Sequence, residues 1–401
     1  MAISEVAPNA RRLPPTGRLI TLQPEQISGL LGRWHGASFL MRMKPRTRFV
    51  LIGLGAAVVL LILAYLDRGL TSPRGVRTTI GVILNPASRP VQVSLALLQD
   101  PVGLVAFAVT LLTPVLFAEQ VTAIQEFNPA NEGNIGYRAD SLECEQITEQ
   151  IERANNRFRR IGGRAGSVLV LVLSAACSSI VNYLINRWGL FPSWNKTGLP
   201  SDVWARRVYA GWWANPHSHL ILAVGLGCLG WYFFYFVIKQ VYMGICFGVY
   251  MHEIAQWKFG LCPNLSANTD GFWGMRPARR FMQATYSSAL GHTIMVVGIL
   301  AVWLPFNAFT VYVLALLLAI NILVVLYPSA VGYASAYREK IYFVDHILRS
   351  HDQPSGDDAA LIERVWGTRT LPFRIGSGLG AVTIYLLFPL LLAAASRVLG
   401  P

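Results

Sequence analysis

The sequence predicts an all-α fold, a polytopic integral membrane helix bundle of about seven transmembrane helices with a cytoplasmic N-terminus and helical cytoplasmic extensions. Two observations support this prediction. The chain of 401 residues is 53% hydrophobic and only 14% charged, whereas a soluble domain usually carries about 25% charge. Several apolar runs also reach the length of about 20 residues that a helix needs to cross a bilayer.

Seven apolar spans follow one another along the chain. The second contains Pro114, which is tolerated in a membrane helix because neighbouring helices can re-satisfy the freed backbone groups. The fifth and sixth are nearly continuous and are joined at 304–307 by LPFN, a short turn. The predicted spans are 49–66, 101–120, 165–186, 218–238, 285–305, 308–329 and 376–396.

The distribution of Lys and Arg predicts the orientation. With the N-terminus inside, 25 of the 34 basic residues fall in cytoplasmic segments and 9 in outer segments, as the positive-inside rule expects. Seven spans then leave the C-terminus outside. The net charge of +13 is explained in this way without a nucleic-acid partner. The lipid bilayer is the expected partner, and the heavy use of Arg favours a bacterial inner membrane.

The N-terminal half divides into four regions. A basic segment, 1–48, precedes the first two spans (49–120), and within it residues 24–43 fit either an interfacial helix or a frayed tail. Region 121–164 contains a soluble helix, 139–160, whose acids precede its arginines, as the helix dipole favours. Its apolar stripe indicates packing on the protein's own helices, with a subunit contact as the alternative; the stripe is Ile147, Ile151, Ala154 and Phe158.

The third and fourth spans (165–238) flank an outer segment, 187–217, that holds five tryptophans. Tryptophan gathers at membrane interfaces, so the segment indicates an aromatic belt, with a small lid as the alternative. The chain stays apolar to about residue 259, and Lys239 marks the expected exit from the membrane. Region 239–284 is then a cytoplasmic helix extension and loop.

The C-terminal regions also alternate membrane spans with a cytoplasmic helical segment. A transmembrane hairpin (285–329) precedes a cytoplasmic helical segment (330–375), and the last span lies in 376–401. Two helical extensions on the same side predict a cytoplasmic subdomain. Its segments could engage a cytoplasmic protein partner or a second copy of the chain.

The loop NTDGFWGMRPARR, residues 268–280, contains the first candidate site residue. Asp-Gly is a common turn dipeptide, and the arginines fit ordinary anchoring at the cytoplasmic face. The alternative is functional: Asp270 is a carboxylate fixed in a tight turn, able to bind a cation or accept a proton.

The same loop resembles the HPDxxGGL-type loop of uncharacterised polytopic bacterial membrane proteins. The resemblance covers roughly residues 210–280 and rests on Asp270, Gly271, Gly274 and Pro277. Asn268 and Thr269 stand where the family has His-Pro, and Trp273 replaces the first paired glycine. That family has no assigned activity, so the resemblance implies a membrane architecture and no particular function.

The other candidates are polar residues within the spans. His292 lies in the fifth span, where an ionisable group is by default a functional hypothesis because burying its charge is costly. Its neighbours Ser288 and Thr293 also fit a small-residue packing face. Asn182 in the third span and Asn321 in the sixth could line a polar path with His292, or cross-link the helices.

No catalytic, metal or cofactor motif accompanies these residues. The five cysteines are scattered without CxxC spacing, and His252-Glu253 lacks the second histidine of an H-E-x-x-H zinc site. Three hypotheses follow. The first is a channel or transporter. The second is a non-catalytic membrane subunit or sensor that engages a cytoplasmic partner. The third is a lipid-acting enzyme with Asp270 and His292 as acid and base, which ranks last because no nucleophile accompanies them.

Overall fold

Four helices of the protein are long and apolar enough to cross a membrane. The structure, a computed structural model, describes residues 45–85, 92–126, 149, 152–160, 163–256, 276–305, 307–350 and 355–367. The segments 24–43 and 376–396 lie outside these residues. The four helices fall on the first four predicted spans: α3 (Pro45–Leu66), α5 (Pro101–Glu126), α7 (Arg164–Trp188) and α9 (Leu220–Gln256).

Two further long helices lie alongside these four. They are α10 (Arg276–Val297), which ends in the π-helical turn η4 (Gly298–Trp303), and α11 (Ala308–Ser350). Within α11 the described apolar stretch covers Ala308–Ile320. α10 is less apolar than the first four helices because it contains the polar residues Thr285, Ser288 and His292. All three are buried. The predicted turn at 304–307 falls between η4 and α11, and the structure describes residues 304, 305 and 307 of it.

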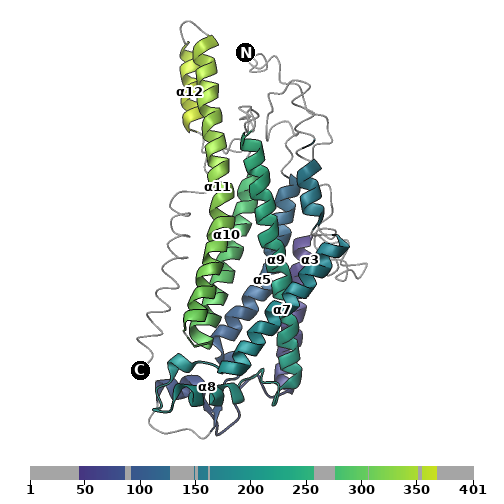
Figure 1. Ribbon diagram of the computed structural model, residues 1–401, viewed down its shortest axis with the longest axis vertical. Helices are drawn as coiled ribbons and strands as arrows, with labels where there is room; N and C mark the ends of the chain where they lie inside the picture. Colours follow the sequence, from purple (N-terminus) through teal and green to yellow (C-terminus); the bar gives the residue numbers. More distant parts are fainter. Residues whose placement is uncertain are drawn as a thin grey trace.

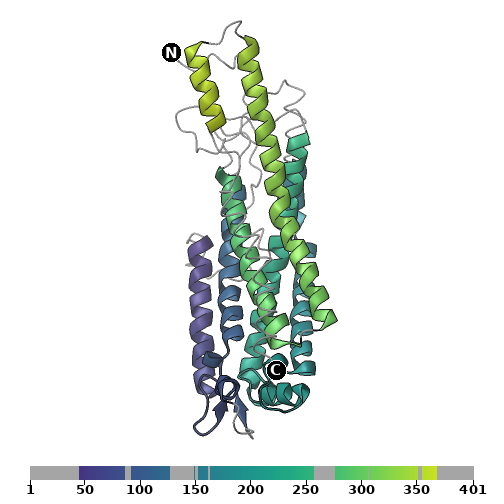
Figure 2. The same cartoon turned by 90° about the vertical axis from the view of Figure 1, so that its left-hand side faces the viewer.

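The long helices pack side by side in a fixed order (Figures 1 and 2). α5 contacts α3, α9 and α10, while α9 also contacts α7 and α11. α5 and α9 are therefore the central pair. Glycines permit close contact with α11: at Gly244 a Cβ would come within 2.4 Å of Val324.

A cap of short elements closes one end of these helices, where Figure 1 shows α8. We use "cap" for residues 67–85, 92–100, 189–219 and 298–305. β1 (Arg77–Thr78) pairs in parallel with β2 (Val93–Ser94). These two-residue strands and an isolated β-bridge between Leu95 and Trp212 are the departures from an all-α fold among the described residues. The other cap elements are α4 (Thr79–Leu84), η2 (Leu97–Gln99), η3 (Pro192–Trp194) and α8 (Ser201–Ala210).

The tryptophans of the cap correct a prediction. Trp204, Trp212 and Trp213 are at most 2% exposed and belong to the apolar core of the cap. The aromatic belt is therefore wrong for these three. Their indole N–H groups find acceptors inside the protein, with Trp204 Nε1 donating to the carbonyl of Phe191 at 3.0 Å.

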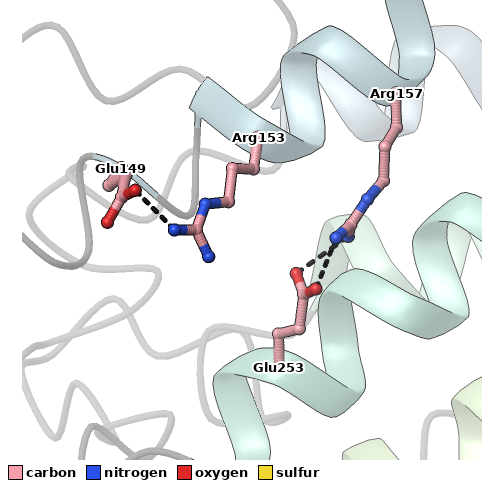
Figure 3. A network of polar contacts seen from close by, with 4 residues as sticks. All are labelled: Glu149, Arg153, Arg157 and Glu253. Atoms are coloured by element: carbon pink, nitrogen blue, oxygen red, sulfur yellow. Dashed lines mark hydrogen bonds and ion pairs between the residues drawn. The ribbon is translucent and has the colours of Figure 1, made fainter.

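The opposite end is held by ion pairs nearer the surface. The helical segment 152–160 lies against the last turns of α9, where Arg157 and Glu253 point toward each other (Figure 3). The two guanidinium–carboxylate distances are 2.9 and 2.6 Å. Ala154 and Phe158 are buried in the same core as Tyr250, which is intramolecular packing of the predicted stripe; Ile147 and Ile151 lie outside the described residues. Beyond this end, α11 continues and pairs with α12 (Gly356–Gly367), as Figure 2 shows.

Lys239 is buried inside the protein. α9 continues past it to Gln256, as the predicted helix extension requires, and its apolar stretch runs to Glu253. Lys239 is 0% exposed, and its Nζ lies 4.5 Å from the centre of the Tyr235 ring. Its place at the exit of α9 from the membrane stays a prediction.

Candidate functional site

A small cavity lies between the long helices, toward the cap. Its volume is about 70 Å³, and α3, α5, α7, α9 and α10 line it together with Trp213 and Trp303. Most of the lining is apolar, and the polar aliphatic side chains are those of Thr110, Ser178 and Asn182. The lining holds no charged side chain. Because an unpaired charge is costly to bury, the cavity suits a small solute without net charge.

The sequence candidate Asn182 lies at this cavity, on α7. Its Nδ2 donates to the carbonyl of Ser178 at 2.9 Å, and Ser178 Oγ donates to the carbonyl of Gly227 on α9 at 3.1 Å. At Gly230 of α9 a Cβ would come within 2.8 Å of Ser178 Oγ. Small residues thus let α7 and α9 approach closely on one side of the cavity.

One buried carboxylate organises the cap above the cavity. Asp100, the residue before α5, is 0% exposed. Its Oδ1 accepts from the Gly103 backbone N–H at 2.9 Å and from Trp303 Nε1 at 3.2 Å. Its Oδ2 accepts from Trp212 Nε1 at 3.1 Å and from Trp213 Nε1 at 3.0 Å. A single side chain therefore ties together three parts of the chain that are far apart in sequence.

The environment of Asp100 combines two opposing effects. Burial raises the pKa of the carboxyl above its ordinary value, and the hydrogen bonds from Gly103 and the three indoles, which favour the ionised form, oppose that rise. Both oxygens are fully used as acceptors, so Asp100 has a structural role. Sequence reasoning missed this residue because its partners lie 112, 113 and 203 positions away.

The second candidate, His292, lies in a buried polar network at a deeper level. Its Nε2 is 3.3 Å from Thr113 Oγ1 on α5 and 3.4 Å from Ser288 Oγ on α10. Those hydroxyl protons are already donated, by Thr113 to the Val109 carbonyl and by Ser288 to Gln240 Oε1. Since each hydroxyl has only one proton, both can only accept from the histidine. Nε2 therefore carries the proton in the neutral ring.

Two glutamines extend this network between helices. Gln240 of α9 donates from Nε2 to the Thr113 carbonyl at 3.0 Å, so it links α9 to α5 as well as to α10. Gln120 of α5 donates to Thr285 Oγ1 of α10 at 2.8 Å. The Oε1 of Gln120 is buried and accepts no hydrogen bond from the part of the chain that the structure describes.

The cavity and the network are neighbours separated by one ring. Phe233 lines the cavity, and its ring lies edge-on to His292, with 5.3 Å between ring centres. Along α5, Thr110 lines the cavity and Thr113 belongs to the network one turn further on. From the rise of an α-helix, Thr113 lies about 20 Å below Asp100 and Gln120 about 30 Å below it.

A larger cleft of about 400 Å³ opens on the outside of the cap. It lies between the turn after α3, strand β2 and the end of α8. Trp213 lines this cleft as well as the cavity. At its edge His219 Nδ1 lies 3.3 Å from Asp67 Oδ2.

The remaining sequence candidates lie outside what the structure describes. Asp270 lies outside the described residues, so its pairing with His292 stays a prediction, as does the loop resemblance. Asn321 belongs to α11, but its side chain lies outside the described part. Within the described residues, no three His, Cys, Asp or Glu side chains gather closely enough to hold a metal ion.

Comparison with known proteins gives no match to a family model, a curated protein or a solved structure.

Proposed function

We propose that the protein is a multi-pass membrane transporter that carries a small uncharged solute through the interior of its helix bundle. The observation that carries the proposal is the position of Trp213, which lines both the cleft and the cavity. The same residue therefore borders both an opening on the protein surface and a cavity among apolar helices.

A second aromatic ring bounds the cavity on its other side. Phe233 stands between the cavity and His292, so the cavity is bracketed by two rings. Beyond Phe233 the polar groups continue through His292 and Gln240 toward Gln120, whose buried Oε1 is an acceptor available to a passing hydroxyl or amide.

The proposal includes the predicted topology of seven spans with the N-terminus inside. In this orientation the cap and its cleft face outward. The start of α3, the end of α5 and the start of α10 face the cytoplasm. Arg46 and Arg280 lie 3.1 and 3.6 Å from Glu119 at that end, which agrees with basic residues gathering on the cytoplasmic side. The uncharged cavity lining favours neutral solutes over ions.

The test is flux into liposomes that contain the purified protein, measured by light scattering with urea and glycerol as probes. Ala106 of α5 lines the cavity, so Ala106→Leu is expected to fill it and bring flux down to that of empty liposomes. Ala108, two residues further along α5, is exposed. Ala108→Leu adds the same side chain outside the cavity and is expected to retain wild-type flux.

Either of two results would overturn the proposal. Liposomes with wild-type protein could pass the neutral probes no faster than empty ones. Alternatively, Ala106→Leu and Ala108→Leu could have equal effects, which would make the cavity irrelevant to the flux.

A second function, that of a non-catalytic membrane subunit, is supported by the projecting α11–α12 pair. Its aromatic side chains Tyr333, Tyr337 and Trp366 are 38%, 41% and 44% exposed. Exposed aromatic groups of this kind are enriched where proteins contact each other. Crosslinking in native membranes that attaches a second protein to these helices, together with absence of flux, would favour this function over transport.

A further inference from the structure

The cleft on the cap has the size and shape of a ligand site. Its volume of about 400 Å³ falls within the range of about 300–1,000 Å³ typical of small-molecule pockets. Three segments form its walls: residues 68–76, residues 92–96 and the stretch from Arg207 to His219. Trp213 also lines the cleft, and its Nε1 donates to Asp100 Oδ2.

The lining of the cleft is basic and rich in hydrogen-bonding groups. It contains Arg68, Arg207 and His219, and no carboxylate is among its described lining residues. The carboxylate nearest in the chain, Asp67, pairs with His219 at its edge. Arginine stays protonated at any physiological pH, so the two guanidinium groups give the cleft a permanent positive charge. The hydroxyl and amide groups are those of Thr71, Gln92, Ser94 and Ser218.

The backbone at Arg68 is a second, independent observation. Its φ is +55°, in the left-handed region that ordinary side chains rarely adopt. The residue closes the end of α3, where the Gly69 and Leu70 amides both donate to the Ala64 carbonyl at 2.9 and 3.0 Å. Helix ends of this type usually use glycine or asparagine. An arginine in this position, among the residues that line the cleft, indicates a use for the guanidinium group that outweighs the unfavourable backbone conformation.

From these observations we infer that the cleft binds a small organic anion through a carboxylate or phosphate group. The planar guanidinium fork suits both groups because it can donate two parallel hydrogen bonds. The ligand can be a soluble anion or the phosphate of a lipid headgroup, since both present the same chemistry. The site goes beyond the proposed transport of neutral solutes, and its occupant need not cross the membrane.

Binding is tested on the full-length protein in phosphatidylcholine discs by calorimetric titration with inorganic phosphate and with succinate. Arg68→Gly removes the guanidinium group and places in the left-handed turn the residue that fits it best, so the fold is retained. Arg207→Gln removes the second positive charge. Each variant is expected to weaken binding by about tenfold, the loss of one charge-assisted hydrogen bond.

The matched control is Arg206→Gln. Arg206 neighbours Arg207 on α8, and both are exposed, but only Arg207 is among the residues that line the cleft. This variant is expected to bind within about twofold of wild type, since an exposed charge outside the cleft acts only through a screened field.

A second arm distinguishes the two sources of the anion. Protein purified from membranes is analysed for bound phosphatidylglycerol by mass spectrometry. Retention of that lipid by wild type and its loss in Arg68→Gly indicate a lipid headgroup, whereas saturable binding of phosphate or succinate indicates a soluble anion. The inference is overturned if neither occurs, or if Arg206→Gln weakens binding as much as Arg207→Gln. Neither measurement uses flux, so its failure is separate from failure of the transport proposal.

Discussion

Two buried polar regions hold the helices together, and they do so with different chemistry. In the cap, the carboxyl group of Asp100 accepts hydrogen bonds from four N–H groups in three parts of the chain. In the middle of the helices, His292, Ser288 and Gln240 form a network of neutral groups. The first region concentrates its connections in a single side chain, and the second distributes them over α5, α9 and α10.

The difference teaches where a protein of this kind can keep an acidic group. A buried carboxyl is tolerable when every acceptor position is used, because each hydrogen bond offsets part of the desolvation cost. Asp100 meets this condition because it precedes α5, where the Gly103 amide is not needed by the helix itself. Within the helices, backbone amides are already bonded, so only side chains remain as partners. Neutral groups suit that environment better.

The largest expected effect is the loss of Asp100. In Asp100→Ala, three buried indole N–H groups lose their acceptor at a cost of about 1–3 kcal/mol each, so the protein is expected to lose about 3 kcal/mol or more of stability. The measurement is the fraction of folded, monodisperse protein after heating in detergent. The control is Asp202→Ala, because Asp202 is exposed in the first turn of α8. A loss in the control as large as that in Asp100→Ala would remove the contrast between the regions.

A smaller effect is expected from the neutral network. His292→Leu removes two long hydrogen bonds, but Thr113 and Ser288 keep their other partners, the Val109 carbonyl and Gln240. The substitution takes the last partner from neither Thr113 nor Ser288, and the expected cost is about 1 kcal/mol. The same heating assay measures it. If His292→Leu destabilises the protein as much as Asp100→Ala, the distributed network is as critical as the single carboxylate.

Weaker still is the ion pair between Arg157 and Glu253. Glu253→Gln keeps the shape of the side chain and removes the charge, and the expected cost is about 0.6 kcal/mol, decreasing with added salt. The matched control is Glu149→Gln, because the Glu149–Arg153 side chains are 58% and 54% exposed against 22% and 31% for Glu253 and Arg157. The exposed pair is expected to contribute only about 0.3 kcal/mol. Equal losses would show that burial does not strengthen this contact.

The pH dependence of Asp100 sharpens the comparison further. Because burial raises its pKa in the folded protein, the folded state holds the proton more tightly than the unfolded chain, whose value is near 3.8. The stability contributed by Asp100 is therefore highest below that pH and falls as the pH rises through the folded-state pKa. The melting temperature of wild type minus that of Asp100→Asn is therefore expected to decrease as the pH rises from about 3.8 through the folded-state pKa. A difference that grows with pH would mean that the four donors outweigh burial.

Hydrophobic length made the long helices predictable. The expected spans 49–66, 101–120 and 165–186 lie within α3, α5 and α7. The burial of His292 also agrees with its place in an apolar run. These features are local, since each depends on residues that are neighbours in the sequence.

The cap could not be predicted in the same way. In the sequence, Asp100 is an ordinary acid directly before a predicted span. No neighbouring residue indicates that three tryptophans donate hydrogen bonds to it. The sequence therefore indicates a membrane interface for Trp212 and Trp213, although they are buried. Contacts with Asp100, more than 100 positions away, decide the roles of both tryptophans.

Lys239 also bears on how the protein is made. On the proposed topology the fourth span is 218–238, so Lys239 enters at the cytoplasmic edge of the bilayer, where a charge costs less than the about 3 kcal/mol of the bilayer centre. The remaining apolar residues of this 37-residue helix oppose that cost. α3, α5 and α7 precede α9 in the chain, are synthesised first and contact it in the folded protein, so they can receive it as it enters. Biogenesis would then follow the order of the sequence, and a copy of α9 expressed without its predecessors would insert poorly.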